Sequence, residues 1–120
     1  MIDHVEIKTM HFDDCKRFYQ TVLRPLHMEL KWADDAAAGF GLIGRDKVSF
    51  LIEKFDRHTP CHLAFSATTS AQVDAFHLAS IQAGFRCNGQ PGPRVHYSPD
   101  YYAAFLLDPD GNNIEAVVHI

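Results

Sequence analysis

The stretch FLLDPDGNNIEAVVHI, residues 105–120, closes the chain and joins a turn signal to a strand signal. DPDG is typical of a tight turn, and the apolar run IEAVV that follows is typical of a strand, yet it carries Glu115 in its middle. Burying an ionised carboxylate costs several kcal/mol unless a cation or strong donors replace its water. Either this strand is half exposed and Glu115 faces solvent, or Glu115 is buried with a partner.

The composition is that of a globular domain, with 47% hydrophobic and 22% charged residues. A net charge of -4 and scattered Lys and Arg residues argue against nucleic-acid binding. No apolar run is long enough to span a membrane and the start of the chain lacks a signal-peptide layout, which predicts a cytoplasmic protein. Three cysteines without a CxxC pair favour neither a disulfide framework nor a thiolate zinc site.

The first half of the chain predicts a βαβββ unit. Residues 3–9 alternate as a strand, and the stretch 12–26 contains an amphipathic helix of about three turns that is ended by Pro25. Its apolar stripe contains Cys15, Phe18 and Val22. Three further strands are expected over residues 28–33, 37–44 and 47–54.

The second half repeats this order. A strand over residues 61–67 precedes a helix within residues 68–84, with Ser70 as its expected N-cap and Gly84 as its stop. The helix stripe is Val73, Phe76, Ala79 and Ala83. Strands are expected around residues 85–89, 101–107 and 112–118.

The two halves can be superimposed on each other. A shift of 58 residues brings His4 onto His62, and a shift of 65 in the closing strands places Phe50 opposite Glu115. Such repetition indicates one supersecondary unit used twice. We therefore predict a single domain over residues 1–120, with one module over about 1–57 and a second over about 58–120.

Strand alternation predicts a shared polar site. His4, His62 and Glu115 each lie on the face opposite the apolar residues of their own strand. Two imidazoles and one carboxylate form a facial triad that suits one divalent ion, such as Fe, Mn, Zn, Ni or Co, and leaves positions open for substrate. The opposing interpretation is that the histidines are ordinary polar residues and Glu115 is exposed.

The paired βαβββ halves, the histidine near the start of each and DPDGNNIE before the end resemble the vicinal oxygen chelate superfamily, which includes glyoxalases, bleomycin-resistance proteins and extradiol dioxygenases. The resemblance covers essentially the whole chain. It implies an α+β fold in which two modules curl their sheets around a metal cup, commonly completed by a second subunit. It also implies that His4, His62 and Glu115 are the metal ligands.

This sequence departs from the glyoxalase I pattern, which has four ligands. The fourth, a carboxylate, is expected at or next to Phe50, and Glu53 points to the face opposite Phe50 by alternation. A glutathione-dependent glyoxalase I is therefore disfavoured. Phe105 stands where the dioxygenases have a tyrosine, and the chain lacks the cation cluster expected of a fosfomycin transferase.

The loop PRVHYSPDYYAAF gathers proton-transferring and aromatic groups. We predict His96, Tyr102 and Tyr97 as catalytic residues, and Phe50, Arg94 and Tyr101 as contacts to substrate. The alternative is an aromatic loop that packs at a dimer contact.

These features predict a metal-dependent lyase or isomerase of glyoxalase-like type, acting on a small substrate through two neighbouring oxygens. The alternatives are an extradiol-dioxygenase-like oxygenase and a non-catalytic dimer that sequesters a drug-like molecule. A homodimer is expected because two small open sheets leave apolar surface to cover. No nucleic-acid or membrane partner is expected.

Overall fold

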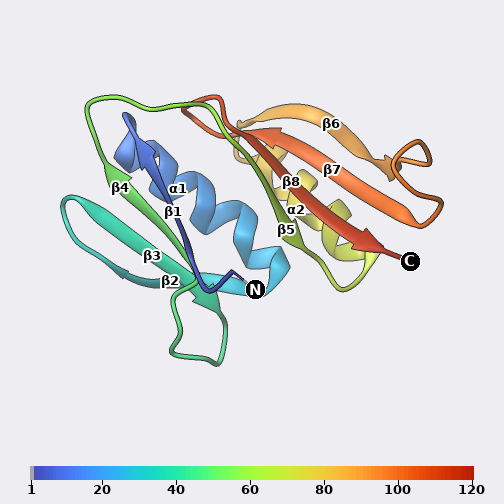
Figure 1. The fold of residues 1–120 in the computed structure, drawn as a ribbon, viewed down its shortest axis with the longest axis horizontal. Helices are drawn as coiled ribbons and strands as arrows, with labels where there is room; N and C mark the ends of the chain where they lie inside the picture. The colour runs from blue at the N-terminus through green and yellow to red at the C-terminus, as the bar shows by residue number, and fades with distance from the viewer. Residues whose placement is uncertain (1) are drawn as a thin grey trace.

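The computed structural model describes residues 2–120 and contains two four-stranded sheets, each with one helix (Figure 1). The first module consists of β1 (Val5–Thr9), α1 (Phe12–Leu23), a short 3-10 helix η1 (Arg24–Leu26), β2 (Met28–Ala33), β3 (Ala37–Leu42) and β4 (Phe50–Lys54). The second consists of β5 (His62–Ser66), α2 (Ser70–Gln82), β6 (Arg86–Pro93), β7 (Tyr101–Leu107) and β8 (Asn113–His119). The predicted α+β fold of two βαβββ modules is confirmed.

Both sheets have the same topology. The strand orders are β1-β4-β3-β2 and β5-β8-β7-β6, and in each sheet the first and last strands of the module pair in parallel while the other pairs are antiparallel. Neither helix among the described residues is long and apolar enough to cross a membrane.

The strand register corrects the predicted alignment of the two halves. Glu115 of β8 lies beside Ala64 of β5. The residue of β1 that corresponds to Ala64 is Glu6, and it lies beside Leu51 of β4. Leu51 is therefore the structural counterpart of Glu115, and Phe50 is one residue out of step. Because neighbouring residues of a strand point to opposite faces, this single step moves Phe50 to the other side of the sheet.

The core lies on the helix side of both sheets. Helix α1 packs on β2 and β4, α2 packs on β6, β7 and β8, and the two helices contact each other (Figure 1). The predicted stripe of α1 is fully buried, and in α2 Val73 and Phe76 are fully buried. Aromatic contacts cross the module boundary, since the rings of Phe50 and Phe65 lie 5.3 Å apart at right angles.

Two local predictions need correction. The N-cap of α2 is Thr69, not Ser70, because Thr69 has an extended backbone and its side chain accepts a hydrogen bond from the Gln72 amide. Strand β6 continues to Pro93, well past the predicted residues 85–89, with irregular pairing around Gly89. The predicted stop of α2 at Gly84 is confirmed by its left-handed backbone, with φ of 87°.

Candidate functional site

Glu115 is buried and bonded to His62. The carboxylate is 2% exposed, and its Oε1 lies 2.8 Å from Nε2 of His62. The two side chains come from the paired strands β8 and β5 and share the face that the helices leave free. Of the two interpretations of the closing strand, the structure therefore has the buried carboxylate with a partner.

Tyr101 supplies the second contact to this carboxylate. Its hydroxyl donates a hydrogen bond to Oε2 of Glu115 from the neighbouring strand β7. Burial, together with this hydrogen bond to Glu115, raises the pKa of Tyr101 to about 12. The phenol is thus a fixed donor at neutral pH, and both oxygens of Glu115 have partners.

Phe105 and Arg94 extend the same face. Phe105 lies directly opposite Glu115 in the register of β7 and β8, and its ring centroid is 6.2 Å from that of His62. The guanidinium carbon of Arg94 lies 5.4 Å from the centroid of the Phe105 ring. These five residues, His62, Arg94, Tyr101, Phe105 and Glu115, are called the second-module face below.

The predicted catalytic loop reaches this face through a row of tilted and edge-to-face ring contacts. The ring of His96 lies 4.2 Å from that of Tyr97, and Tyr97 lies 5.1 Å from Tyr101. His96 and Tyr97 are exposed, so they lie at the outer end of this row of rings, and Tyr101 at its inner end is hydrogen-bonded to Glu115.

Tyr102 points away from the second-module face. Its hydroxyl donates to Oδ1 of Asp74 on α2 at 2.6 Å, and this hydrogen bond raises the pKa of Tyr102. Successive residues of β7 alternate between faces, so the step from Tyr101 to Tyr102 separates the two hydroxyls. The structure thus brings Tyr101 to Glu115 and leaves Tyr102 on the helix side.

His4 does not meet the other two predicted ligands within one chain. Its side chain is 60% exposed, and its Nδ1 lies 2.9 Å from Asp3. Within residues 2–120 the one group of three candidate ligand atoms closer than 4.8 Å to one another is formed by Cys15, Asp108 and Asp110. A single chain therefore assembles His62 and Glu115 but not the full triad.

Phe50 belongs to the core. It is 2% exposed, and its ring centroid lies 4.8 Å from that of Tyr19 on α1. Glu53 does point away from Phe50, as predicted, but this puts it on the open face of the first sheet, where Lys8 donates a hydrogen bond to it. The position equivalent to Glu115 holds the apolar Leu51, so the first module supplies no carboxylate there.

Comparison with known proteins identifies the family. The model of the Glyoxalase/Bleomycin resistance protein/Dioxygenase superfamily matches residues 1–116. The chain belongs to this superfamily. The resemblance predicted from DPDGNNIE and the paired histidines is thereby confirmed. No curated protein matches the chain significantly.

Solved structures of superfamily members share the fold. A glyoxalase/bleomycin resistance protein from Albidiferax ferrireducens is 28% identical, with 96% of this chain and 95% of that chain covered and a TM-score of 0.78. A lactoylglutathione lyase from Agrobacterium tumefaciens is 16% identical, with coverages of 98% and 92% and a TM-score of 0.72. A glyoxalase I mutant from Zea mays is 21% identical, with a TM-score of 0.70. The match covers 97% of this chain and 45% of the Zea mays chain.

The Cys15, Asp108 and Asp110 group of this superfamily member is a structural clasp. Asp108 accepts hydrogen bonds from the Tyr19 hydroxyl at 2.7 Å, from the Asn112 side chain at 2.8 Å, and from the backbone amides of Asp110 and Asn112. Asp110 accepts from the hydroxyl of Thr9, the thiol of Cys15 and the amide of Met10. These bonds tie the DPDG turn to β1 and α1.

The clasp is not arranged as a metal site. Burial raises the pKa of the Cys15 thiol, which keeps it protonated as a donor to Asp110. Each oxygen of the Asp108 carboxylate accepts two hydrogen bonds from the protein and has no lone pair left for an ion, whereas each oxygen of Glu115 has a single partner. The DPDG element thus joins the two modules, which gives its presence in this fold a physical reason.

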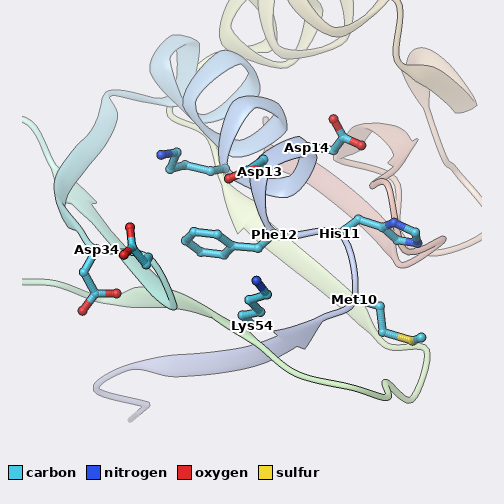
Figure 2. A pocket seen from close by; sticks show the side chains of 9 residues that line it. Met10, His11, Phe12, Asp13, Asp14, Asp34 and Lys54 are labelled. Atoms are coloured by element: carbon cyan, nitrogen blue, oxygen red, sulfur yellow. The ribbon is translucent and has the colours of Figure 1, made fainter.

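A polar hollow of about 650 Å³ lies elsewhere, at the start of α1. Figure 2 shows Phe12 at its centre, with Lys54 below the ring and Asp34 to its left. Acidic and basic side chains both line it, and no residue of the second-module face takes part. This hollow and the candidate site are therefore separate places.

Proposed function

We propose that this protein is a metal-dependent enzyme of lyase or isomerase type that acts on a small substrate through two neighbouring oxygens. The observation that carries the proposal is the buried carboxylate of Glu115, 2% exposed, with a histidine nitrogen 2.8 Å away. A buried carboxylate is stable only with a cation or several donors beside it.

The residues fit a divalent ion. Metal bonds of about 2.1 Å to nitrogen and oxygen place neighbouring ligands about 3 Å apart, close to the separation of His62 Nε2 and Glu115 Oε1. The Tyr101 hydroxyl holds the other carboxylate oxygen, as second-sphere donors commonly do around metal ligands. Two of the three ligands of a facial triad are thus already arranged in the chain.

His4 completes the triad from a second copy of the chain. This step is supported by its exposure on the first module and by the absence of a His4, His62 and Glu115 group within residues 2–120 of one chain. A homodimer with two shared sites follows, each site pairing the first module of one subunit with the second module of the other.

The chain's own residues carry the remaining chemistry. A divalent ion bound here supplies Lewis acidity that stabilises negative charge on substrate oxygen. Tyr101 fixes the orientation of Glu115, and Phe105 walls the site with an apolar ring. His96, at the outer end of the row of rings, transfers a proton to or from substrate, with Tyr97 positioning it.

One observation favours a different function. Both oxygens of Glu115 already have protein donors, so the carboxylate is satisfied without an ion. A non-catalytic dimer that sequesters a small molecule is the second candidate. An oxygenase of the extradiol type is disfavoured because Phe105, which faces the site beside Glu115, has no hydroxyl.

Elemental analysis after anaerobic metal reconstitution separates the two candidates. We expect about one divalent ion per wild-type subunit and little in His62→Ala protein, with His58→Ala, an exchange outside the site, as the control. Turnover is then screened on ketoaldehydes, catechols and epoxides, with and without glutathione. Metal-free wild-type protein after reconstitution would exclude the enzyme proposed here.

A further inference from the structure

Arg94 is held across the second-module face by the backbone. Its Nη2 donates to the carbonyl oxygen of Gln90 at 2.7 Å, and its Nη1 donates to those of Gly92 and Pro93 at 2.9 and 3.3 Å. Three carbonyl acceptors fix an otherwise flexible side chain in one direction. The guanidinium is therefore preorganised before any ligand arrives.

Two glycines make room for this side chain. A Cβ added to Gly89 would lie 2.9 Å from the Phe105 ring and 3.4 Å from Nη2 of Arg94. A Cβ added to Gly92 would lie 3.4 Å from Nη1 of the same guanidinium. Strand β6 thus has no side chain at either position, and Arg94 occupies this space beside the Phe105 ring.

The charge of Arg94 is not neutralised within the chain. Among residues 2–120 no carboxylate oxygen lies within 4.0 Å of its nitrogens, whereas Lys8, Lys31 and Lys47 each have such a partner. Carbonyl oxygens satisfy donors but carry no net charge. The two N–H groups not used by the carbonyls remain available to an anion.

Phe105 connects this cation to the proposed metal ligands. Its ring lies 5.4 Å from the guanidinium carbon of Arg94 and 6.2 Å from the ring of His62. A substrate lying over Phe105 therefore meets His62 and Glu115 at one end and Arg94 at the other.

We propose that Arg94 determines specificity, and that the substrate is a small acid carrying a carboxylate beyond the oxygen pair that binds beside Glu115. This inference rests on the proposed function. A single guanidinium matches the single charge of a carboxylate better than the two charges of a phosphate group, for which a second cation is expected.

Two 2-oxo acids of equal length test the inference. 2-Oxoglutarate and 2-oxopentanoate share the 2-oxo-carboxylate end, and only 2-oxoglutarate has a second carboxylate. Dissociation constants are measured by calorimetry in metal-loaded and in metal-free protein. Wild type is expected to bind 2-oxoglutarate about tenfold more tightly than 2-oxopentanoate.

The variant Arg94→Gln should reduce this preference to near unity while leaving the affinity for 2-oxopentanoate unchanged. Arg86→Gln, at the other end of β6, removes the same charge and should keep the preference. A purely structural role for Arg94 would instead weaken binding of both acids equally, which overturns the inference. Equal affinities in wild type, or no binding of either acid, overturn it without recourse to any variant.

Failure of the proposed function has a different signature. Metal content reports on that function alone, whereas the ratio of the two affinities reports on Arg94 in either metal state. Wild type that takes up metal but does not prefer 2-oxoglutarate refutes only the role of Arg94. Wild type that prefers 2-oxoglutarate but takes up no metal refutes only the metal-dependent enzyme.

Discussion

The two modules share one topology but differ in what their open faces carry. On the second, Glu115 is 2% exposed and is held by His62 and Tyr101. On the first, the strand that corresponds to β8 carries Leu51 and, two residues on, Glu53, whose side chain is 39% exposed and pairs with Lys8. The repeat thus preserved the fold, while a preorganised acidic site exists in only one copy.

This contrast separates the roles of neighbouring residues on β4. Replacing Phe50 with Ala should lower the free energy of unfolding by about 3–5 kcal/mol, since it removes a ring from the core. Leu51→Ala, on the half-exposed open face, should cost less than about 1.5 kcal/mol. Urea denaturation measures both. Equal losses would mean that the strand faces are assigned incorrectly.

The β7–β8 turn and its first-module counterpart, between β3 and β4, should also differ in how much they contribute to the free energy of unfolding. Asp108→Ala removes the acceptor for the Tyr19 hydroxyl and the Asn112 side chain, both buried, and should cost about 2–4 kcal/mol. Asp46→Ala in the exposed β3–β4 loop should change stability by less than about 0.5 kcal/mol. A neutral Asp108→Ala would refute the clasp, and the same urea titration decides.

Tyr101→Phe tests whether the Tyr101 hydroxyl positions Glu115 for metal binding. The variant keeps the ring but removes the donor to Glu115, so metal affinity should fall by about tenfold or more. Competition with a fluorescent chelator measures the dissociation constant. Tyr102→Phe is the matched control, because its hydroxyl serves Asp74 on the helix side. Equal effects of the two changes would contradict the positioning role of Tyr101.

The smallest expected effect lies on the first module. The hydrogen bond from Lys8, with its charge, holds the pKa of Glu53 below its usual value. This lowered pKa adds stability above the unfolded-state pKa, and the contribution is lost as pH falls through the folded pKa. In Lys8→Met protein the pKa of Glu53 should rise, as followed by NMR titration. An unchanged pKa would show that the pair does not persist in solution.

Sequence patterns predicted the elements and their order. Period-two alternation located the strands, and the helix stripes through Phe18 and Phe76 located the core. The pairing of His62 with Glu115 was also accessible, because both lie opposite apolar neighbours on strands that the repeat makes adjacent.

Features that depend on strand register and on irregular strand pairing could not be predicted from the sequence. The one-residue offset between the modules decides whether Phe50 or Leu51 faces the site, and no local pattern reports it. Tyr101 and Tyr102 are neighbours of equal chemistry, and only the phase of β7 separates them. The seat of Arg94 depends on the bulged pairing of β6 around Gly89.

The central proposal is that His62 and Glu115 of one subunit share a divalent ion with His4 of another. Metal content of mixed dimers tests it most directly. His4→Ala and Glu115→Gln proteins should each be nearly metal-free alone. After unfolding and refolding together in equal amounts, they should bind about a quarter of an ion per subunit, because half of the dimers contain one intact shared site. A mixture that stays metal-free, or single variants that retain full metal content, would contradict the shared site.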